Sequence, residues 1–377
     1  MILRDRILPL LALVCWALAV PGLLDRGSVL PNTSPPIFVM PIWLLYVPAI
    51  AILGLFRRWN ALVAAVAAYL LVVSVWGLAD GWHRAPGERE GASYWWYLAA
   101  FWLCCWTFAE RLSRWGSDTT RGRIAGFVIP LAFGLTLLFL WEAITRGANV
   151  PQVLLPAPSQ IWERLLASVP TLVADFQQTF LKAVLAGYVI GCASGFVVAI
   201  LVDRSPFLKR GLLPIGNFVS ALPIIGIAPI LVMWFGFDWQ SKAAVVVTMT
   251  FFPMLVNTVA GLAVASAIER DLMRTYASSY WQTLVKLRLP AAAPFIFNAL
   301  KINSTLALIG AIVAEFFGTP IVGMGFRIST EVGKLNIDLV WAEIAVAAVV
   351  GSAFYGVIAL LERAVTFWHP SVRGGRG

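Results

Sequence analysis

Charged residues are scarce in this sequence. Only 12% of its 377 residues are charged, whereas 60% are hydrophobic, and an ordinary soluble domain carries roughly a quarter charged residues. This composition excludes an ordinary soluble domain and indicates an integral membrane protein. The net charge of +9 does not indicate a nucleic-acid-binding protein, because the basic residues lie in short clusters between apolar runs, as membrane topology requires.

Residue types that commonly carry catalysis or bind metals are also few. The two histidines, His83 and His369, have no carboxylate and nucleophile nearby in the sequence. The four cysteines lie inside apolar runs, with no spacing typical of a metal site or a disulfide framework. No phosphate-binding loop of the GxxxxGK(S/T) type occurs. The sequence therefore predicts no enzymatic activity, no cofactor and no bound metal, and any nucleotide must be handled by a partner.

Long apolar runs make up most of the chain. A helix needs about 20 apolar residues to cross a bilayer, and about ten stretches meet or approach that length. They are residues 7–24, 37–56, 61–79, 93–109, 124–143, 179–202, 213–235, 243–263, 295–317 and 339–361. The sequence thus predicts an all-α integral membrane protein with about ten transmembrane helices. The first run resembles a signal peptide, but its candidate cleavage triplet, residues 17–19, lies inside the run, which favours a retained span.

The positive charges predict an orientation. Lys and Arg are enriched in cytoplasmic loops. With the amino terminus inside, most of the 28 Lys and Arg residues fall on the inner side. Both termini and residues 268–290 are therefore expected in the cytoplasm.

Residues 268–294 form a polar, basic insert between apolar runs, which we call the knob. Two short helical patterns, residues 267–275 and 279–287, are separated by the small residues Ala277 and Ser278. Two short helices at an angle would form a compact unit outside the bilayer. We expect Pro290 and Pro294 to end it before the next apolar run, because proline lacks the N–H that a helix interior needs.

The knob resembles the cytoplasmic loop of ABC importer permeases. The pattern of that loop is EAA, three residues, Gly, nine residues, Ile, any residue, Leu-Pro. Anchoring it on Leu289-Pro290 places Leu287 at the Ile, Ala277 at the Gly and residues 271–273 at the EAA. A turn with positive φ would strain Ala277, whereas a helical or bridge-region turn would accept it.

Further segments carry the same resemblance from residue 124 onward. Tyr276-Ala277-Ser278 is similar to the Tyr-Gly-Ala/Leu-Ser of the branch that imports nitrate, taurine, alkanesulfonates and thiamine precursors. Residues 154–159, 221–236, 314–315 and 323–325 resemble other motifs of that branch, in the right order. The resemblance implies that residues 121–377, with the last six spans, form a type I ABC importer permease domain. Residues 1–120 would then be a four-helix extension.

Three features suggest how the membrane domain works. Pro214, Pro223 and Pro229 remove backbone donors from one apolar stretch, so we expect either a broken helix that borders the translocation path or a kinked packing helix. Glu315 lies near the outer end of a span, where a role in the path and a role at the boundary remain open. Residues 187, 191 and 195 are glycines on one helix face, which predicts close packing of another backbone.

The resemblance implies a transmembrane permease subunit of an ABC importer in the bacterial inner membrane. Its partners would be an ATPase subunit, an external solute-binding protein and a second permease copy or paralogue. The implied ATPase-coupling residues are Asp271, Arg274, Tyr276, Ala277, Ser278, Leu287, Leu289 and Pro290, and the implied path residues are Pro223, Pro229 and Glu315. A secondary transporter and a regulatory membrane scaffold are the alternatives. The sequence does not identify the solute, because the binding protein sets most of the selectivity in such importers.

Overall fold

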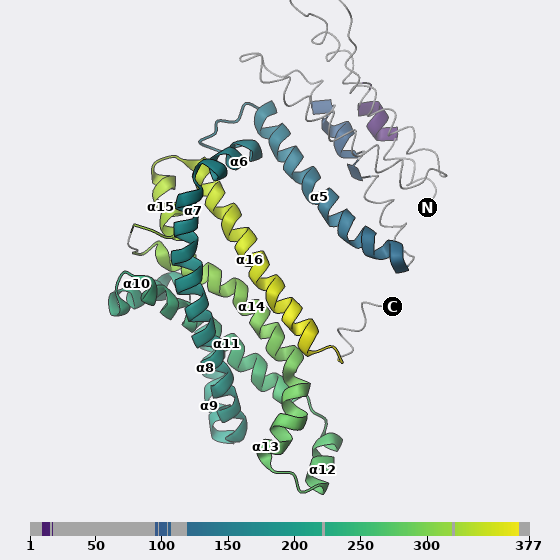
Figure 1. Ribbon diagram of the computed structural model, residues 1–377, viewed down its shortest axis with the longest axis vertical. Coiled ribbons are helices and arrows are strands. Elements are labelled where there is room, and N and C mark those ends of the chain that lie inside the picture. The colour runs from purple at the N-terminus through teal and green to yellow at the C-terminus, as the bar shows by residue number, and fades with distance from the viewer. Residues whose placement is uncertain are drawn as a thin grey trace, which may run out of the picture. The chain divides into compact units, whose positions relative to one another are not determined.

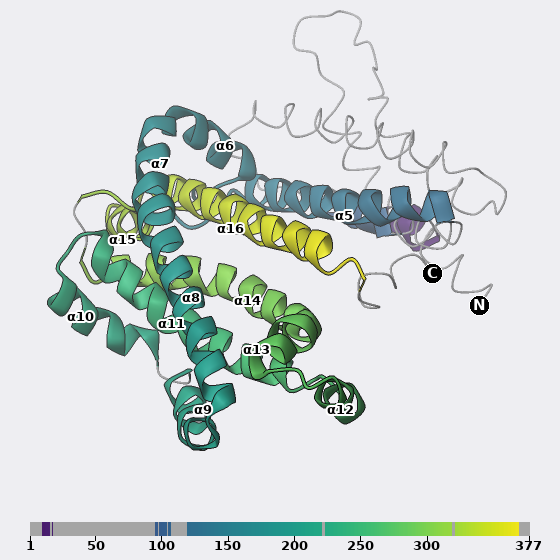
Figure 2. The ribbon, with the colours of Figure 1, turned by 60° about the horizontal axis from the view of Figure 1, so that its bottom comes forward.

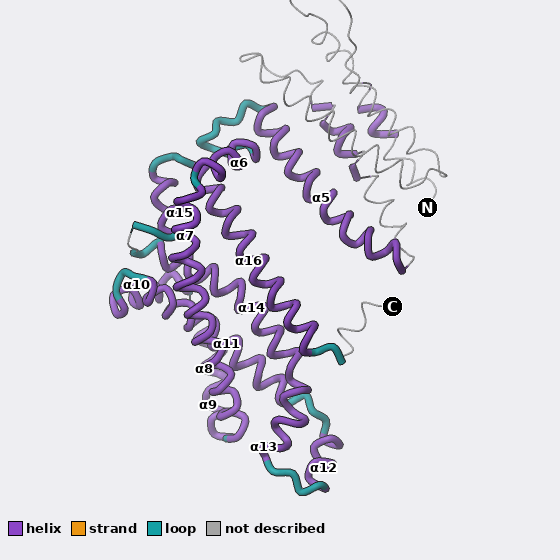
Figure 3. Tube along the Cα trace, in the orientation of Figure 1, coloured by secondary structure: helices purple, strands orange, loops and turns teal. Residues whose placement is uncertain are grey.

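The computed structural model describes residues 119–220, 223–318 and 321–368, together with parts of 10–17 and 95–106. Helices joined by short loops make up this part of the chain, and no strand occurs in it (Figure 3). The chain divides into two compact units, Met1–Gln160 and Ile161–Gly377. This division lies after residue 160, whereas the sequence predicted a boundary after residue 120. The predicted spans 37–56 and 61–79, most of 7–24 and part of 93–109 lie outside the described residues.

In the first unit the main described element is α5 (Thr119–Gly147). Its residues Ile129–Gly147 are long and apolar enough to cross a membrane, in agreement with the predicted span 124–143. Near its end, the Glu142 carboxylate accepts hydrogen bonds from the backbone N–H of Ser159 (2.9 Å) and from the Ser159 hydroxyl (2.7 Å). This contact connects the end of α5 to the start of α6 (Pro158–Ala167). Ser159 is the last residue of the segment 154–159 that resembles a family motif.

The second unit contains the remaining helices (Figure 1). In order they are α7 (Val169–Phe176), the π-helix η2 (Gln177–Val184), α8 (Leu185–Arg204), α9 (Pro206–Ser220), α10 (Ile224–Phe235), α11 (Trp239–Leu262), α12 (Ala267–Thr275), α13 (Tyr280–Thr283), the π-helix η3 (Leu284–Arg288), α14 (Leu289–Glu315), α15 (Met324–Gly333) and α16 (Ile337–Val365). Four continuous stretches of this unit are long and apolar enough to span a membrane: Val169–Arg204, Trp239–Leu262, Tyr280–Glu315 and Ile337–Val365.

The helix α11 lies between α8 and α14, and close backbone approach holds it there. A Cβ atom added at Gly187 would lie 2.5 Å from the Val246 Cβ, and one at Gly195 would lie 2.5 Å from the Phe251 carbonyl oxygen. At Gly191 an added Cβ would collide with the Thr250 hydroxyl. These three glycines face α11, which confirms the prediction of a close-packing helix face.

Residues 213–235, predicted as one span, are divided between two helices. α9 ends at Ser220, Pro223 has an extended backbone (φ −68°, ψ 119°), and α10 starts at Ile224. Prolines 214 and 229 lie inside α9 and α10. Twelve residues are too few to cross a bilayer as an α-helix. The structure therefore has the broken helix, one of the two alternatives predicted from the prolines, and no single helix covers residues 213–235.

Pro290 and Pro294 do not end the knob, contrary to the sequence expectation. The helical stretch Tyr280–Glu315 is continuous through both prolines. Pro290 lies in the first turn of α14, where a missing N–H is tolerated, and the wider π-helical turn of η3 precedes it. Pro294 lies inside α14. The second knob helix is therefore the first part of a long, apolar helical stretch rather than a separate piece.

Candidate functional site

The knob consists of α12, a turn and the start of the helix that continues into α14 (Figure 2). Both of its helices begin with reciprocal capping. The Ser266 hydroxyl accepts from the Glu269 N–H (3.2 Å), while Glu269 accepts from the Ser266 N–H (2.8 Å). Ser279 and Gln282 repeat the arrangement at α13 (3.3 and 2.9 Å). The Ser266 N–H lowers the pKa of Glu269 below its usual range, so this cap is ionised at neutral pH.

The sequence left open whether the turn at Ala277 has a positive φ or a helical or bridge-region conformation. Ala277 has φ +50°, in the left-handed region that favours glycine. The Ala277 N–H donates to the Arg274 carbonyl (2.8 Å) and the Ser278 N–H to the Met273 carbonyl (3.0 Å). These two bonds form a Schellman motif, which usually has glycine at this position. Alanine is strained there by about 1–2 kcal/mol, so the helical or bridge-region alternative is wrong.

Several large apolar side chains of the knob are exposed. Ile268 and Tyr276 are 82% and 76% exposed, and Leu272 and Trp281 are more than half exposed. Residues 268, 272 and 276 are spaced by four, so they lie on one side of α12. Exposed apolar groups on a polar loop indicate a protein contact. Sequence reasoning singled out only Tyr276 in this set, although the spacing of four could have identified the others.

The charged pair on α12 contributes little to its structure. Asp271 and Arg274 approach to 3.3 Å, and their side chains are 68% and 83% exposed. An exposed pair of this kind contributes about 0–1 kcal/mol. Both charges are therefore available to a partner.

The base of the knob is held by a group that sequence reasoning missed. Arg288 donates to both carboxylate oxygens of Asp203 (2.7 Å each) and to the Leu262 carbonyl (3.0 and 2.8 Å). The Tyr280 hydroxyl also donates to Asp203 (3.2 Å). Asp203 belongs to the last turn of α8, and Leu262 is the last residue of α11. Arg288 thus ties the base of the knob to the ends of two membrane helices.

The remaining predicted knob residues belong to this base. Leu289 packs on a buried cluster that contains Leu262, Leu284 and Ala292, and Leu287 and Pro290 are half-buried. The structure therefore separates the predicted coupling residues into an exposed tip, Asp271 to Ser278, and a packed base, Leu287 to Pro290.

Glu315, predicted as a path residue, is buried and bonded. It is 2% exposed, and it accepts from the Thr179 hydroxyl (2.8 Å) and the Gly325 N–H (2.7 Å). A Cβ at Gly325 would lie 2.9 Å from the Glu315 Cβ. The Ala-Glu and Gly-Met-Gly segments noticed in the sequence therefore meet, and together they fix the start of α15.

Asp175 of α7 completes this arrangement. It is fully buried and accepts from the Gly323 N–H (2.6 Å) and from the Arg327 Nε (2.8 Å), and this pairing raises the pKa of Arg327. The Met324 N–H donates to Thr179 (2.8 Å). Three successive N–H groups at the start of α15 are thus bound by side chains of other helices, at the end of α14 opposite the knob.

The broken helix has one packed and one open side. Ala228 and Leu231 of α10 are buried against Val245 and Ala314, while Ile225, Met233 and Trp234 are exposed. Pro223 is exposed and Pro229 is half-buried. Within the part of the chain that the structure describes, no group of three His, Cys, Asp or Glu residues is placed to hold a metal ion.

Known proteins match this chain over the same region. A family model described as the inner membrane component of binding-protein-dependent transport systems matches residues 165–367. A probable ABC transporter permease of Haemophilus influenzae is 30% identical over 60% of this chain and 91% of its own length. A formylaminopyrimidine transport permease of Halalkalibacterium halodurans is 32% identical, over 63% of this chain and 95% of its own length. A putative aliphatic sulfonates transport permease of Bacillus subtilis is 28% identical, over 71% and 96%.

The family match covers more than half of the chain and includes the knob, the broken helix and α15. It confirms the resemblance, the branch and the type I permease domain that the sequence motifs implied. A membrane component of such a system moves solute and leaves ATP hydrolysis to another subunit. This chain belongs to the family of inner-membrane permease components of binding-protein-dependent transport systems, and it is a transmembrane permease subunit of an ABC importer.

Proposed function

We propose that the knob is the site at which a separate ATPase subunit drives this permease. The observation that carries the proposal is the combination of an exposed apolar tip and a rigid base. The tip offers Leu272, Tyr276 and Ala277 to a groove of the partner, and Asp271 and Arg274 add charge at its edge.

The base explains how motion at the tip would reach the membrane. Helix α13 continues through η3 into α14 without a break, and Arg288 binds Asp203 of α8 and Leu262 of α11. A displacement of the knob would therefore move the ends of three packed helices together. Chains of packed helices and ion pairs carry energetic coupling between distant sites.

The solute path is proposed to run along the broken helix, at Pro223 and Pro229. The backbone groups released at the break need partners, and a water-filled path provides them. Glu315 is proposed to contribute indirectly, by fixing α15 at the outer end of α14.

The topology and the assembly complete the proposal. Both termini and the knob lie in the cytoplasm, about ten helices span the membrane, and residues 1–120 form an extension beside the permease domain 121–377. A solute-binding protein docks on the α15 side, and a second copy of this chain or a paralogue completes the path. Relatives named for formylaminopyrimidine and for aliphatic sulfonates suggest a small polar organic solute.

Cross-linking tests the coupling site. Ser278 at the tip of the knob and the exposed Ser329 on α15 are each changed to Cys in a variant whose native cysteines are replaced. With the ATPase bound, Ser278→Cys should cross-link to it and Ser329→Cys should not. Cross-linking from Ser329→Cys alone would place the ATPase on the other side of the membrane and refute the proposal.

A further inference from the structure

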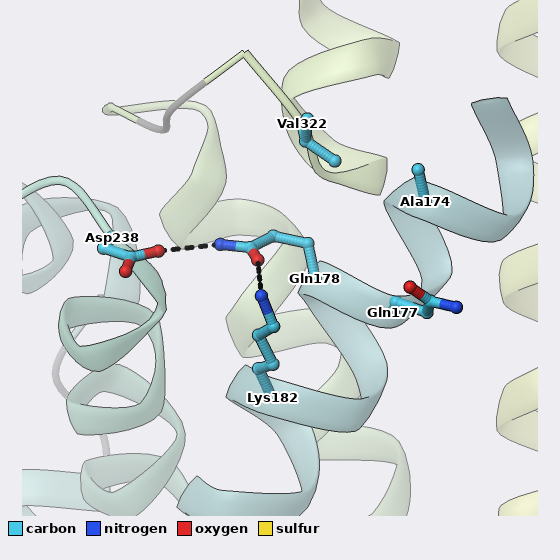
Figure 4. A pocket seen from close by; sticks show the side chains of 6 residues that line it. All are labelled: Ala174, Gln177, Gln178, Lys182, Asp238 and Val322. Atoms are coloured by element: carbon cyan, nitrogen blue, oxygen red, sulfur yellow. Dashed lines mark hydrogen bonds between the residues drawn. The ribbon is translucent and has the colours of Figure 1, made fainter.

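A shallow depression lies in the second unit beside Asp238, the residue that precedes α11. Figure 4 shows the six side chains that line it. Its volume is about 330 Å³, which suits a small molecule. The residues that line it are Ala174, Gln177, Gln178, Lys182, Asp238 and Val322. Four of these six side chains are polar or charged, although three of them, Gln177, Gln178 and Lys182, belong to the strongly apolar stretch Val169–Arg204.

Lys182 and Gln178 are therefore unusual residues for their position. Charged side chains in a membrane span are costly and mark functional sites more often than packing sites. Both lie in the π-helix η2, and π-helical turns occur frequently at functional sites. The Lys182 side chain is exposed, but it folds back on its own helix. Its ammonium group donates to the Gln178 amide oxygen (3.0 Å).

The Gln178 amide connects two opposite charges. Its nitrogen donates to the Asp238 Oδ1 (2.9 Å), while its oxygen accepts from Lys182. The opposite orientation of the amide would place its N–H groups against the ammonium group and its oxygen against the carboxylate. The two charges therefore determine the orientation of the Gln178 amide. Hydrogen bonds from the Trp239 N–H and from Gln178 lower the pKa of Asp238, and Asp238 is ionised at neutral pH.

Both charged groups keep unused bonding capacity towards the depression. An ammonium group has three N–H donors, of which Gln178 uses one. A carboxylate has about four acceptor positions, of which Gln178 and the Trp239 N–H use two at Asp238. Lys182 and Asp238 are both exposed. A bound anion would be attracted by Lys182 and repelled by the Asp238 carboxylate. A bound cation would be attracted by Asp238 and repelled by Lys182. A solute that carries both charges would complement both groups at once.

We propose that Lys182 and Asp238 form a binding site for a small zwitterionic solute at the outer mouth of the path, with Gln178 holding the two charges apart. The anionic group of the solute binds Lys182 and its ammonium group binds Asp238. This inference rests on the proposed function, because it needs the path along the broken helix to open beside Asp238, three residues after α10 ends. It assigns residues and a solute class to that path.

Binding of taurine, which carries a sulfonate and an ammonium group, tests the proposal. The full-length permease with its ATPase is placed in nanodiscs of phosphatidylglycerol and cardiolipin, which lack zwitterionic headgroups, and ligand-observed NMR gives the Kd. Taurine should bind more tightly than ethanesulfonate or ethylamine. Lys182→Met and Asp238→Asn should each raise the taurine Kd at least tenfold, and Lys182→Arg should keep it within about threefold, since a tenfold change corresponds to about 1.4 kcal/mol.

The controls separate this idea from its rivals. Lys209→Met, an exposed position on α9, should leave the taurine Kd unchanged. Equal Kd values for the wild type, Lys182→Met and Asp238→Asn, or no taurine binding to the wild type, would overturn the site. Loss of taurine binding in discs of phosphatidylethanolamine would assign the site to a lipid headgroup instead. Co-purification of the ATPase with the wild-type permease is measured separately, so a failure of the coupling proposal is distinguishable from a failure of this site.

Discussion

At the scale of single residues, the strained turn at Ala277 gives the clearest prediction. Ala277→Gly removes the Cβ at φ +50° and should stabilise the turn by up to about 1 kcal/mol, since part of the relieved strain is offset by the flexibility of glycine in the unfolded chain. Hydrogen exchange at the Ser278 N–H should slow by up to about fivefold.

The matched control is Ala267→Gly, at the first residue of α12. The backbone there is helical, so glycine relieves no strain and should destabilise the helix and speed exchange in α12. Faster exchange in Ala277→Gly than in the wild type would contradict the left-handed assignment.

The Arg288–Asp203 pair is a second residue-scale test. Their side chains are only 14% and 7% exposed, so removal of one partner leaves a buried charge without compensation. Arg288→Met should lower the free energy of unfolding by about 3–5 kcal/mol, measured by chemical denaturation in detergent.

Because the two residues bond each other, their effects should not add. The double variant Asp203→Asn with Arg288→Met should be more stable than the sum of the two single changes predicts. Additive losses would mean that the two groups act independently and that the base of the knob is not held by this pair.

At the scale of elements, the start of α15 depends on close approach to α14. An added Cβ at Gly325 would collide with the Ile312 carbonyl oxygen, which belongs to the backbone and cannot move alone. Gly325→Ala should therefore displace α15 and break its bonds to Glu315 and Thr179, giving at least tenfold faster hydrogen exchange at residues 323–325. Gly333→Ala in the same helix, where nothing lies within 4 Å of an added Cβ, should leave exchange there unchanged. Equal behaviour of the two variants would contradict the packing of α15 on α14.

The elements also show what could be predicted from the sequence. The bounds of α12 agree with the predicted pattern 267–275, because its start and end carry local signals in the capping pair Ser266 and Glu269 and in the turn after Thr275. The failed prediction that Pro290 ends a helix used a local rule, and the π-helical turn before Pro290 depends on packing that the rule does not contain.

Contacts between distant parts of the chain could not be predicted either, because local sequence rules do not contain them. Arg288 and Asp203 are separated by 85 residues, and no pattern in either segment names the other. The positive φ of Ala277 was also open, since alanine is compatible with several turns and only the hydrogen bonds of the folded loop select one. The identification of the path residues stays a prediction.

At the scale of the whole molecule, the family match begins at residue 165, well after the proposed extension, residues 1–120. Deletion of residues 1–120 should therefore leave the ATPase bound, because the knob and its base belong to the second unit. Co-purification of the ATPase with the truncated permease, at a yield within about twofold of the full chain, is the expected outcome. A truncated protein that inserts stably yet fails to bind the ATPase would show that the extension takes part in coupling.

The most direct test of the coupling role is Ala277→Arg in the reconstituted complex. Ala277 is at the exposed tip of the knob, and a tight protein contact tolerates little added volume, with overpacking costing about 1–3 kcal/mol and an unpaired buried charge more. Since about 1.4 kcal/mol is tenfold, Ala277→Arg should weaken association with the ATPase at least tenfold and lower solute-stimulated ATP hydrolysis, while membrane insertion and the Ala277→Gly control remain at wild-type levels. Wild-type association and ATP hydrolysis in Ala277→Arg would contradict the assignment of the knob as the coupling site.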